Sequence, residues 1–162
     1  MLNLKIETYL KLIFTISVVS IISAYFIEYV LGYQPCNLCL IERIPYGLSI
    51  ALIVINNVLK KQEKVIFLFL TLIFIFSFII SFYHFGIEEG FFKESAICEV
   101  RNIGEIISKE ELLKQLSEKT ISCKDVTFRI FGFSLTAINM ILSLFLLIMS
   151  TKIFIDYEKF KN

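Results

Sequence analysis

Residues 65–87 read VIFLFLTLIFIFSFIISFYHFGI and contain no Lys, Arg, Asp or Glu. A helix of this length, rising ~1.5 Å per residue, is long enough to cross the ~30 Å of hydrocarbon in a bilayer. Ile and Phe are also common in strands, but a segment in lipid must satisfy its own backbone hydrogen bonds, which favours a helix. The polarity does not alternate as it does in the strands of a membrane barrel. The stretch therefore predicts a membrane-spanning helix.

Three further stretches are nearly free of charge, within a chain of 162 residues that is 57% hydrophobic. Soluble domains are ordinarily much less apolar. The first of these stretches continues through Tyr29 to Leu31 without a small-x-small cleavage pattern, so we expect a retained span and not a cleaved signal peptide. We predict an all-α membrane protein, a four-transmembrane-helix bundle that forms one domain (1–162), with spans at about 10–31, 41–59, 65–87 and 130–151.

The distribution of basic residues predicts the orientation of the bundle. Four spans place both termini on one side of the membrane, and the segments on that side hold eight Lys or Arg. The opposite side also holds eight, spread over about twice the length. By the positive-inside rule, the denser side faces inward. We therefore expect both termini inside and two outer loops, at about 32–40 and 88–129.

The longer outer loop contains a signal for the start of a helix. Ser108 and Glu111 have the spacing of a capping box, in which each side chain bonds the backbone amide of the other residue. The helix expected to follow, at about 109–119, carries a stripe of Leu opposite Lys and Glu. Such a short amphipathic helix would lie along the membrane surface or on the bundle, with a solvated loop helix as the alternative.

All four cysteines lie in the two outer loops, Cys36 and Cys39 in the shorter one and Cys98 and Cys123 in the longer one. Random placement in a chain that is about half membrane-spanning would rarely leave all four outside the spans. This distribution disfavours the use of Cys as a small buried apolar residue. Disulfides persist in an outer, oxidising compartment, so we expect these thiols to form them.

The stretch QPCNLCLIERIP, residues 34–45, separates the first two cysteines by two residues. This spacing lets two thiols close a readily exchanged disulfide where the chain turns into a helix. The amides at the start of that helix would lower the pKa of one thiol. Arg43 lies one helical turn after Cys39 and would lower that pKa further.

Other uses of the cysteines fit the sequence less well. A c-type haem site needs His directly after the second Cys, where this chain has Leu40. A zinc site would need a second knuckle, but Cys98 and Cys123 are 25 residues apart with no close His. A structural disulfide between Cys98 and Cys123 stays open, and closing that loop would contribute about 3 kcal/mol in the chain-entropy model.

Two cysteine pairs on one side of a membrane can act as a relay. The pair in the long loop could exchange with a soluble thiol protein, and the pair beside the bilayer could pass two electrons to a lipid-soluble quinone. Arg43 could polarise a quinone carbonyl, because its guanidinium is always charged and carries several donors. Its alternative role is that of an interfacial anchor paired with Glu42. The residues alone leave both roles open.

Three motifs occur in order along the chain: CNLCLIERIPY (36–46), YHFGIEEGF (83–91) and CKDVTFRIFGFSLTAIN (123–139). They resemble the first periplasmic motif, the end of the third span and the start of the fourth span of the bacterial disulfide bond formation protein B (DsbB) family. Two features depart from the family pattern. Phe92 and Phe128 stand where the family often has Trp, and no Gly-Pro precedes the first cysteine of the long loop.

The resemblance implies a quinone-dependent thiol oxidase of the bacterial inner membrane, with cytoplasmic termini and periplasmic cysteines. By analogy, Cys98 and Cys123 form the disulfide that oxidises a periplasmic thioredoxin-like protein of the DsbA type, with Cys98 in the mixed disulfide. Cys36 and Cys39 then reoxidise that pair and pass the electrons to ubiquinone, or to menaquinone under anaerobic conditions.

The resemblance also suggests which residues meet the quinone. Arg43 and His84 are the main candidates, and Glu28 and Glu88 are weaker ones. His84 could bind or protonate a quinone, or could serve only as a structural hydrogen-bonding group. We expect no metal ligands and no nucleic-acid partner. The alternative functions are a vitamin K epoxide reductase-like enzyme, whose CxxC lies late in its bundle, and a non-enzymatic bundle with structural disulfides.

Overall fold

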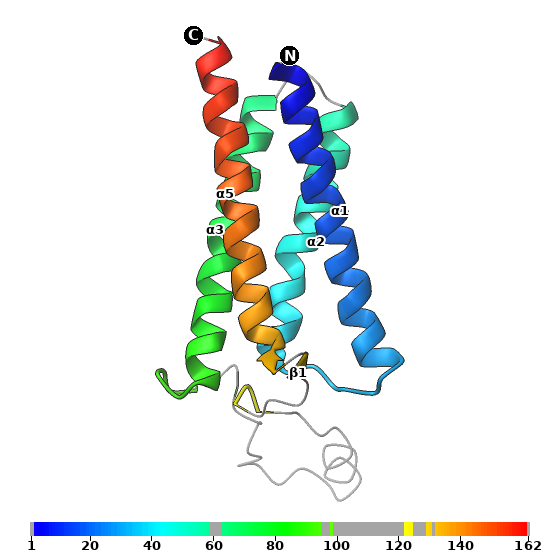
Figure 1. Ribbon diagram of the computed structural model, residues 1–162, viewed down its shortest axis with the longest axis vertical. Coiled ribbons are helices and arrows are strands. Elements are labelled where there is room, and N and C mark those ends of the chain that lie inside the picture. The colour runs from blue at the N-terminus through cyan, green and yellow to red at the C-terminus, as the bar shows by residue number, and fades with distance from the viewer. Residues whose placement is uncertain are drawn as a thin grey trace, which may run out of the picture.

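The computed structural model describes residues 2–58, 63–94, 98, 122–124, 129–130 and 132–161. The long helices in these residues are α1 (Leu2–Tyr29), α2 (Asn37–Val58), α3 (Glu63–Glu88) and α5 (Leu135–Lys161). They run along the long axis of a bundle whose N and C termini lie at the same end (Figure 1). The short helix expected at about 109–119 lies outside the described residues.

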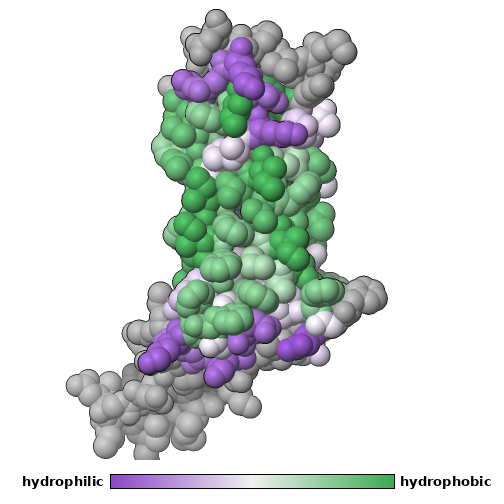
Figure 2. Space-filling model, turned by 60° about the vertical axis from the view of Figure 1, so that its left-hand side comes forward, coloured by the Kyte–Doolittle hydropathy of each residue, from purple (hydrophilic) through white to green (hydrophobic). Residues whose placement is uncertain are grey.

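Each of these helices contains a stretch that is long and apolar enough to cross a membrane: Ile6–Tyr29, Asn37–Asn57, Glu63–Glu88 and Leu135–Lys159. Figure 2 shows a broad apolar belt between two hydrophilic ends of the molecule. Large apolar side chains are exposed on every long helix, for example Ile22, Leu48, Phe76 and Ile148. Such a surface suits contact with lipid. The chain is therefore a multi-pass membrane protein, and the prediction of an all-α four-helix membrane bundle is confirmed.

The interior of the bundle is built around α3, which makes its most extensive contact with α5. Phe67, Leu70 and Phe74 of α3 are at most 2% exposed and share one buried cluster with Leu146 and Ile153 of α5. Lipid tails are as apolar as these side chains, so close packing between the helices supplies much of the stabilisation.

The second helix begins at Asn37, earlier than the predicted span start near 41. The carbonyl of Cys36 accepts a hydrogen bond from the Leu40 amide at 3.2 Å, so Cys36 occupies the position just before the helix. The CxxC motif therefore spans the start of α2, with Cys36 just before the helix and Cys39 in its first turn. In this position a thiol can accept hydrogen bonds from the free backbone amides of the first turn.

The last helix begins at Leu135, later than the predicted span start near 130. The reason is a short antiparallel hairpin in which β1 (Arg129–Ile130) pairs with β2 (Phe133–Ser134). Gly132 has the positive φ of 88° that this turn requires. The hydroxyl of Ser134 then accepts from the Ala137 amide at 3.2 Å and caps α5.

Two leucines of α5 offer a matched test of the packing. Leu146 is 0% exposed and Leu144 is 41% exposed. We expect Leu146→Ala to lower the free energy of unfolding by about 2–5 kcal/mol, because it opens a cavity in the core. Leu144→Ala should cost less than about 1 kcal/mol, because it changes only the outer surface. Thermal unfolding in detergent micelles measures both, and equal losses would contradict the packing described for Leu146.

Candidate redox site

The start of α2 and the end of α3 lie together at the end of the bundle opposite the termini (Figure 1). Cys36 directly precedes α2, and Cys39 lies in its first turn. Both are free thiols, with their Sγ atoms 2.8 Å apart. The Cys39 amide donates to Cys36 Sγ at 3.3 Å. An amide at a helix start favours the thiolate form of the sulfur that it contacts.

Cys36 is buried, yet its pKa is lowered to about 5. The main cause is the hydrogen bond from the Cys39 thiol, and burial acts in the opposite direction. Hydrogen bonds from His84 and from the Cys39 amide lower the pKa further. The sequence predicted a low pKa for one thiol of the motif and expected Arg43 to lower it. In the structure, the side chains that lower the pKa of Cys36 are those of Cys39 and His84.

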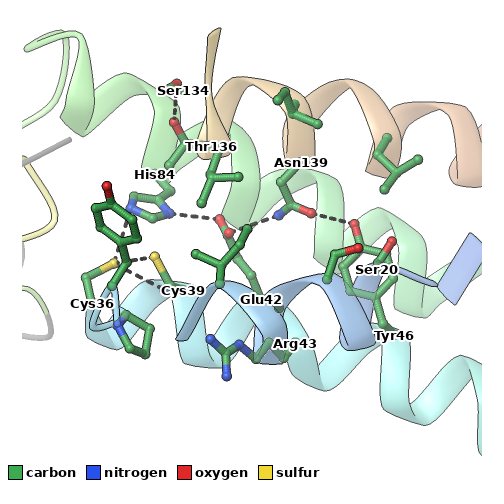
Figure 3. Close-up of a pocket in the computed structure, with 18 of the residues that line it drawn as sticks. Ser20, Cys36, Cys39, Glu42, Arg43, Tyr46, His84, Ser134, Thr136 and Asn139 are labelled. Atoms are coloured by element: carbon green, nitrogen blue, oxygen red, sulfur yellow. Dashed lines mark hydrogen bonds and ion pairs between the residues drawn. The ribbon is translucent and has the colours of Figure 1, made fainter. Parts of the chain in front are cut away.

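His84 of α3 joins the thiols to a row of polar side chains inside the bundle (Figure 3). Its Nε2 lies 3.5 Å from Cys36 Sγ, and its Nδ1 lies 3.0 Å from Oε1 of Glu42. His84 is 1% exposed and Glu42 is 7% exposed. A buried carboxylate is costly unless it has partners. The contact therefore stabilises Glu42 and also sets the direction in which the imidazole faces the sulfur.

The other oxygen of Glu42 accepts from the amide nitrogen of Asn139 at 2.9 Å. That nitrogen also donates to Ser81 at 2.8 Å, and Oδ1 of Asn139 accepts from the Tyr46 hydroxyl at 2.5 Å. Figure 3 shows Glu42, Asn139 and Tyr46 in line between the helices. The row connects α2, α3 and α5, and it ends at the sulfur of Cys36.

Arg43 contacts α1. Its Nη1 lies 2.5 Å from Oε2 of Glu28, and its guanidinium carbon lies 5.0 Å from the ring centre of Tyr25. The suggested pairing with Glu42 was wrong, because neighbouring residues on a helix point about 100° apart. Glu42 faces the interior, whereas Arg43 faces α1. Of the weaker candidates from the sequence, Glu28 is the one that holds Arg43.

A cavity of about 400 Å³ lies beside the thiols, and residues of α1, α2, α3 and α5 line it. Cys36, Cys39, Arg43 and His84 all border it, so the fold brings together these four residues that the sequence singled out. Much of its wall is apolar and comes from α1 and α5, including Val19, Ile27, Leu135, Ile138 and Leu142. An apolar cavity with a few polar groups is typical of small-molecule sites.

Glu88 also borders this cavity. One of its oxygens accepts from the hydroxyl of Thr136. The other oxygen is buried and has no hydrogen-bond partner among the described residues. Such an atom is a point where a ligand or a water molecule can bind.

The second cysteine pair, Cys98 and Cys123, forms a disulfide with its Cα atoms 5.4 Å apart. This is the pairing that the resemblance implied. Both residues are buried in one cluster with Cys36 and Ile87, and Cys123 also borders the cavity. The fold thus collects both cysteine pairs at one end of the bundle, beside one cavity.

Sequence reasoning missed the polar row, although helical spacing contains a signal for part of it. Glu42 lies three residues after Cys39 and four before Tyr46, which places all three on one face of α2. Ser81 lies three residues before His84 on α3 in the same way. The sequence near these residues does not indicate that this face of α2 meets this face of α3.

Comparison with known proteins agrees with this site. The family model for disulfide bond formation protein DsbB matches residues 7–153. The uncharacterized protein RP370 of Rickettsia prowazekii (strain Madrid E) is 32% identical to this chain over 136 residues, which cover 83% of this chain and 79% of that protein. The family match sets aside the vitamin K epoxide reductase-like alternative. The chain belongs to the DsbB family of disulfide bond formation proteins.

Proposed function

We propose that this protein is a thiol:quinone oxidoreductase that reoxidises a DsbA-type dithiol oxidase. Its family forms disulfide bonds. The observation that carries the finer assignment is the apolar cavity, because Cys36, Cys39 and Cys123 border it together. Both sulfur pairs and a space for an apolar electron acceptor therefore meet at one end of the bundle. In this proposal that end faces the periplasm at the bacterial inner membrane, and both termini are cytoplasmic.

The reduced partner supplies two electrons through thiol–disulfide exchange. One of its thiolates attacks Cys98, the bond to Cys123 breaks, and the partner leaves with a disulfide of its own. Cys98 and Cys123 are then thiols, and they reoxidise by exchange with a disulfide between Cys36 and Cys39. The structure has the pairing expected after this exchange, with Cys36 and Cys39 as free thiols and the other pair bonded.

A quinone, when bound, would accept two electrons from the reduced Cys36 and Cys39 and take up two protons. The cavity suits that chemistry, because its apolar wall would take the ring while Arg43, His84 and Glu88 supply polar groups. The ion pair with Glu28 engages one of the five N–H donors of Arg43, and within the described part of the chain other donors remain for a carbonyl oxygen. Ubiquinone and menaquinone are the two candidates for the acceptor.

His84 is placed to handle protons at the sulfur as well as to line the cavity. Its Nε2 is 3.5 Å from Cys36, within reach of the thiol proton. The Glu42 carboxylate on Nδ1 holds the ring so that Nε2 faces the sulfur. His84 therefore serves as the acid–base group of the dithiol, in keeping with the usual role of a buried His beside a nucleophile.

Quinone reduction by the purified protein tests the proposal directly. With a reduced DsbA-type protein as donor, we expect the wild type to reduce ubiquinone-1 and Cys36→Ala to fall to the uncatalysed rate. A partner that lacks its second cysteine should be trapped on Cys98, as read by mass spectrometry. Absence of quinone reduction, or equal rates for Cys36→Ala and the wild type, would favour a non-enzymatic bundle with structural disulfides.

Arg43→Ala separates quinone binding from anchoring. The variant should raise the KM for ubiquinone-1 by roughly 10- to 100-fold, because it removes a charged hydrogen bond worth about 1.5–3 kcal/mol. Thiol exchange at Cys98 and Cys123 should continue at the wild-type rate. Glu28→Gln is the control, because it weakens the contact with α1 and leaves the guanidinium in place. A KM that changes equally in both variants would assign Arg43 to anchoring.

The low pKa of Cys36 predicts how its reactivity depends on pH. The thiolate is the reactive form and exists above the pKa, so alkylation of Cys36 by iodoacetamide should stay fast down to about pH 5 and slow below it. Cys39→Ala removes the hydrogen bond that is the main cause of this low pKa. In this variant, the pH at which alkylation of Cys36 slows should move up toward the pKa of ~8.5 of an ordinary thiol. Peptide mass spectrometry of the reduced protein measures both. A wild-type inflection near the ordinary value would contradict the geometry described for this thiol.

A further inference from the structure

Three side chains at the redox site have the chemistry of metal ligands. The Sγ atoms of Cys36 and Cys39 and a ring nitrogen of His84 all lie within 4.8 Å of one another. The sequence disfavoured zinc because Cys98 and Cys123 form no second knuckle and have no His close by in the chain. The fold removes that objection, since it brings His84 of α3 to a thiol that lies 48 residues earlier.

The sulfur–nitrogen distance matches a tetrahedral zinc site, and the sulfur–sulfur distance is about 1 Å too short. With Zn–S near 2.3 Å and Zn–N near 2.0–2.1 Å, neighbouring ligand atoms are separated by about 3.5–3.8 Å. Cys36 Sγ and His84 Nε2 already lie 3.5 Å apart. The two sulfurs are 2.8 Å apart, so one of them must move by roughly 1 Å to match. A rotation of the Cys39 side chain in the first turn of α2 can supply this shift.

The imidazole is held as it is in many protein metal sites. A ligating His usually donates its other ring N–H to a carboxylate, which orients the ring and leaves one nitrogen for the metal. Here Nδ1 lies 3.0 Å from Glu42, and Nε2 faces the sulfurs. Asn139 fixes the second oxygen of Glu42 at 2.9 Å. The carboxylate and its own partner are therefore already in position.

The surroundings also allow an ion to enter and to keep an open coordination position. The cavity of about 400 Å³ borders Cys36, Cys39 and His84, so a water molecule can occupy the fourth position from that side. Two thiolates balance the charge of a divalent cation, which reduces the cost of holding it where Cys36 is 6% exposed and His84 is 1% exposed.

We propose that the reduced protein binds Zn²⁺ through Cys36, Cys39 and His84, with Glu42 as the positioning residue for the imidazole. Binding displaces any proton that the two sulfurs still carry and transfers no electrons. While the ion is bound, both sulfurs are coordinated, so the bond between Cys36 and Cys39 cannot form until the metal leaves. Zinc would thus hold the protein in its reduced state. This inhibitory effect rests on the proposed function, whereas the binding does not.

Cobalt substitution tests the binding. Co²⁺ is added without oxygen to the full-length protein in detergent micelles, reduced with a phosphine, and Zn²⁺ is then added to displace it. We expect one Co²⁺ per chain, thiolate-to-cobalt charge-transfer absorption and loss of that absorption with Zn²⁺. Cys36→Ser should abolish the signal, and His84→Ala and Glu42→Gln should each weaken affinity by roughly 10- to 100-fold. The matched control, Cys98→Ser with Cys123→Ser, should retain it.

Three outcomes would overturn the site. The first is the absence of thiolate–cobalt absorption in the reduced wild type, and the second is an affinity that His84→Ala leaves unchanged. Binding of equal strength to the protein oxidised at Cys36 and Cys39 would also contradict it.

The inhibitory effect has a separate test. Zn²⁺ at concentrations that saturate the site should stop quinone reduction, and a chelator should restore it. Zinc binding without loss of activity would overturn the inhibition. If the zinc-free protein reduces no quinone, the proposed function fails while the cobalt result still decides the metal site.

Discussion

The carboxylate of Glu42 lies inside an apolar bundle, and both of its oxygens are bonded, one to His84 and one to Asn139. Because an unpartnered carboxylate in that place would be strongly destabilising, these contacts constrain how α2, α3 and α5 can pack. They also determine the chemistry at the sulfurs. With Nδ1 of His84 held by Glu42, Nε2 must face Cys36. Three features depend on this orientation: the part of the low pKa of Cys36 that His84 contributes, the proposed acid–base role and the proposed metal site.

Two consecutive charged residues of α2 serve different parts of the site. Glu42 points into the polar row, and Arg43 points to Glu28 and Tyr25 on α1. The helical period separates them, so one helix turn supplies both an interior acceptor and an interfacial cation. Glu42 and Arg43 both border the cavity, and Cys36 and Cys39 lie at its edge. Because Glu42 and Arg43 point in different directions, their charges are bonded to other side chains, and the apolar wall of the cavity can lie beside them.

Much of the fold could be predicted from the sequence because the bilayer restricts the choices. A charge-free stretch such as residues 65–87 has to be a helix in lipid, and the four stretches lead directly to the observed bundle. The helix starts were less predictable. Cys36 and Cys39 bracket the start of α2 at Asn37, and the hairpin before Leu135 delays α5, because a backbone capping bond and a turn glycine decide these positions and not hydropathy.

The sequence by itself determined the spans, the placement of all four cysteines at or beyond the ends of the spans and the CxxC spacing at a helix start. These features depend on hydrophobicity and on residues close together in the chain. Only the tertiary structure decided that His84 meets Cys36, that Glu42 pairs with His84 and Asn139, and that Arg43 pairs with Glu28. Those contacts join helices whose relative rotation follows from packing, and no local pattern encodes which faces of two apolar helices will meet.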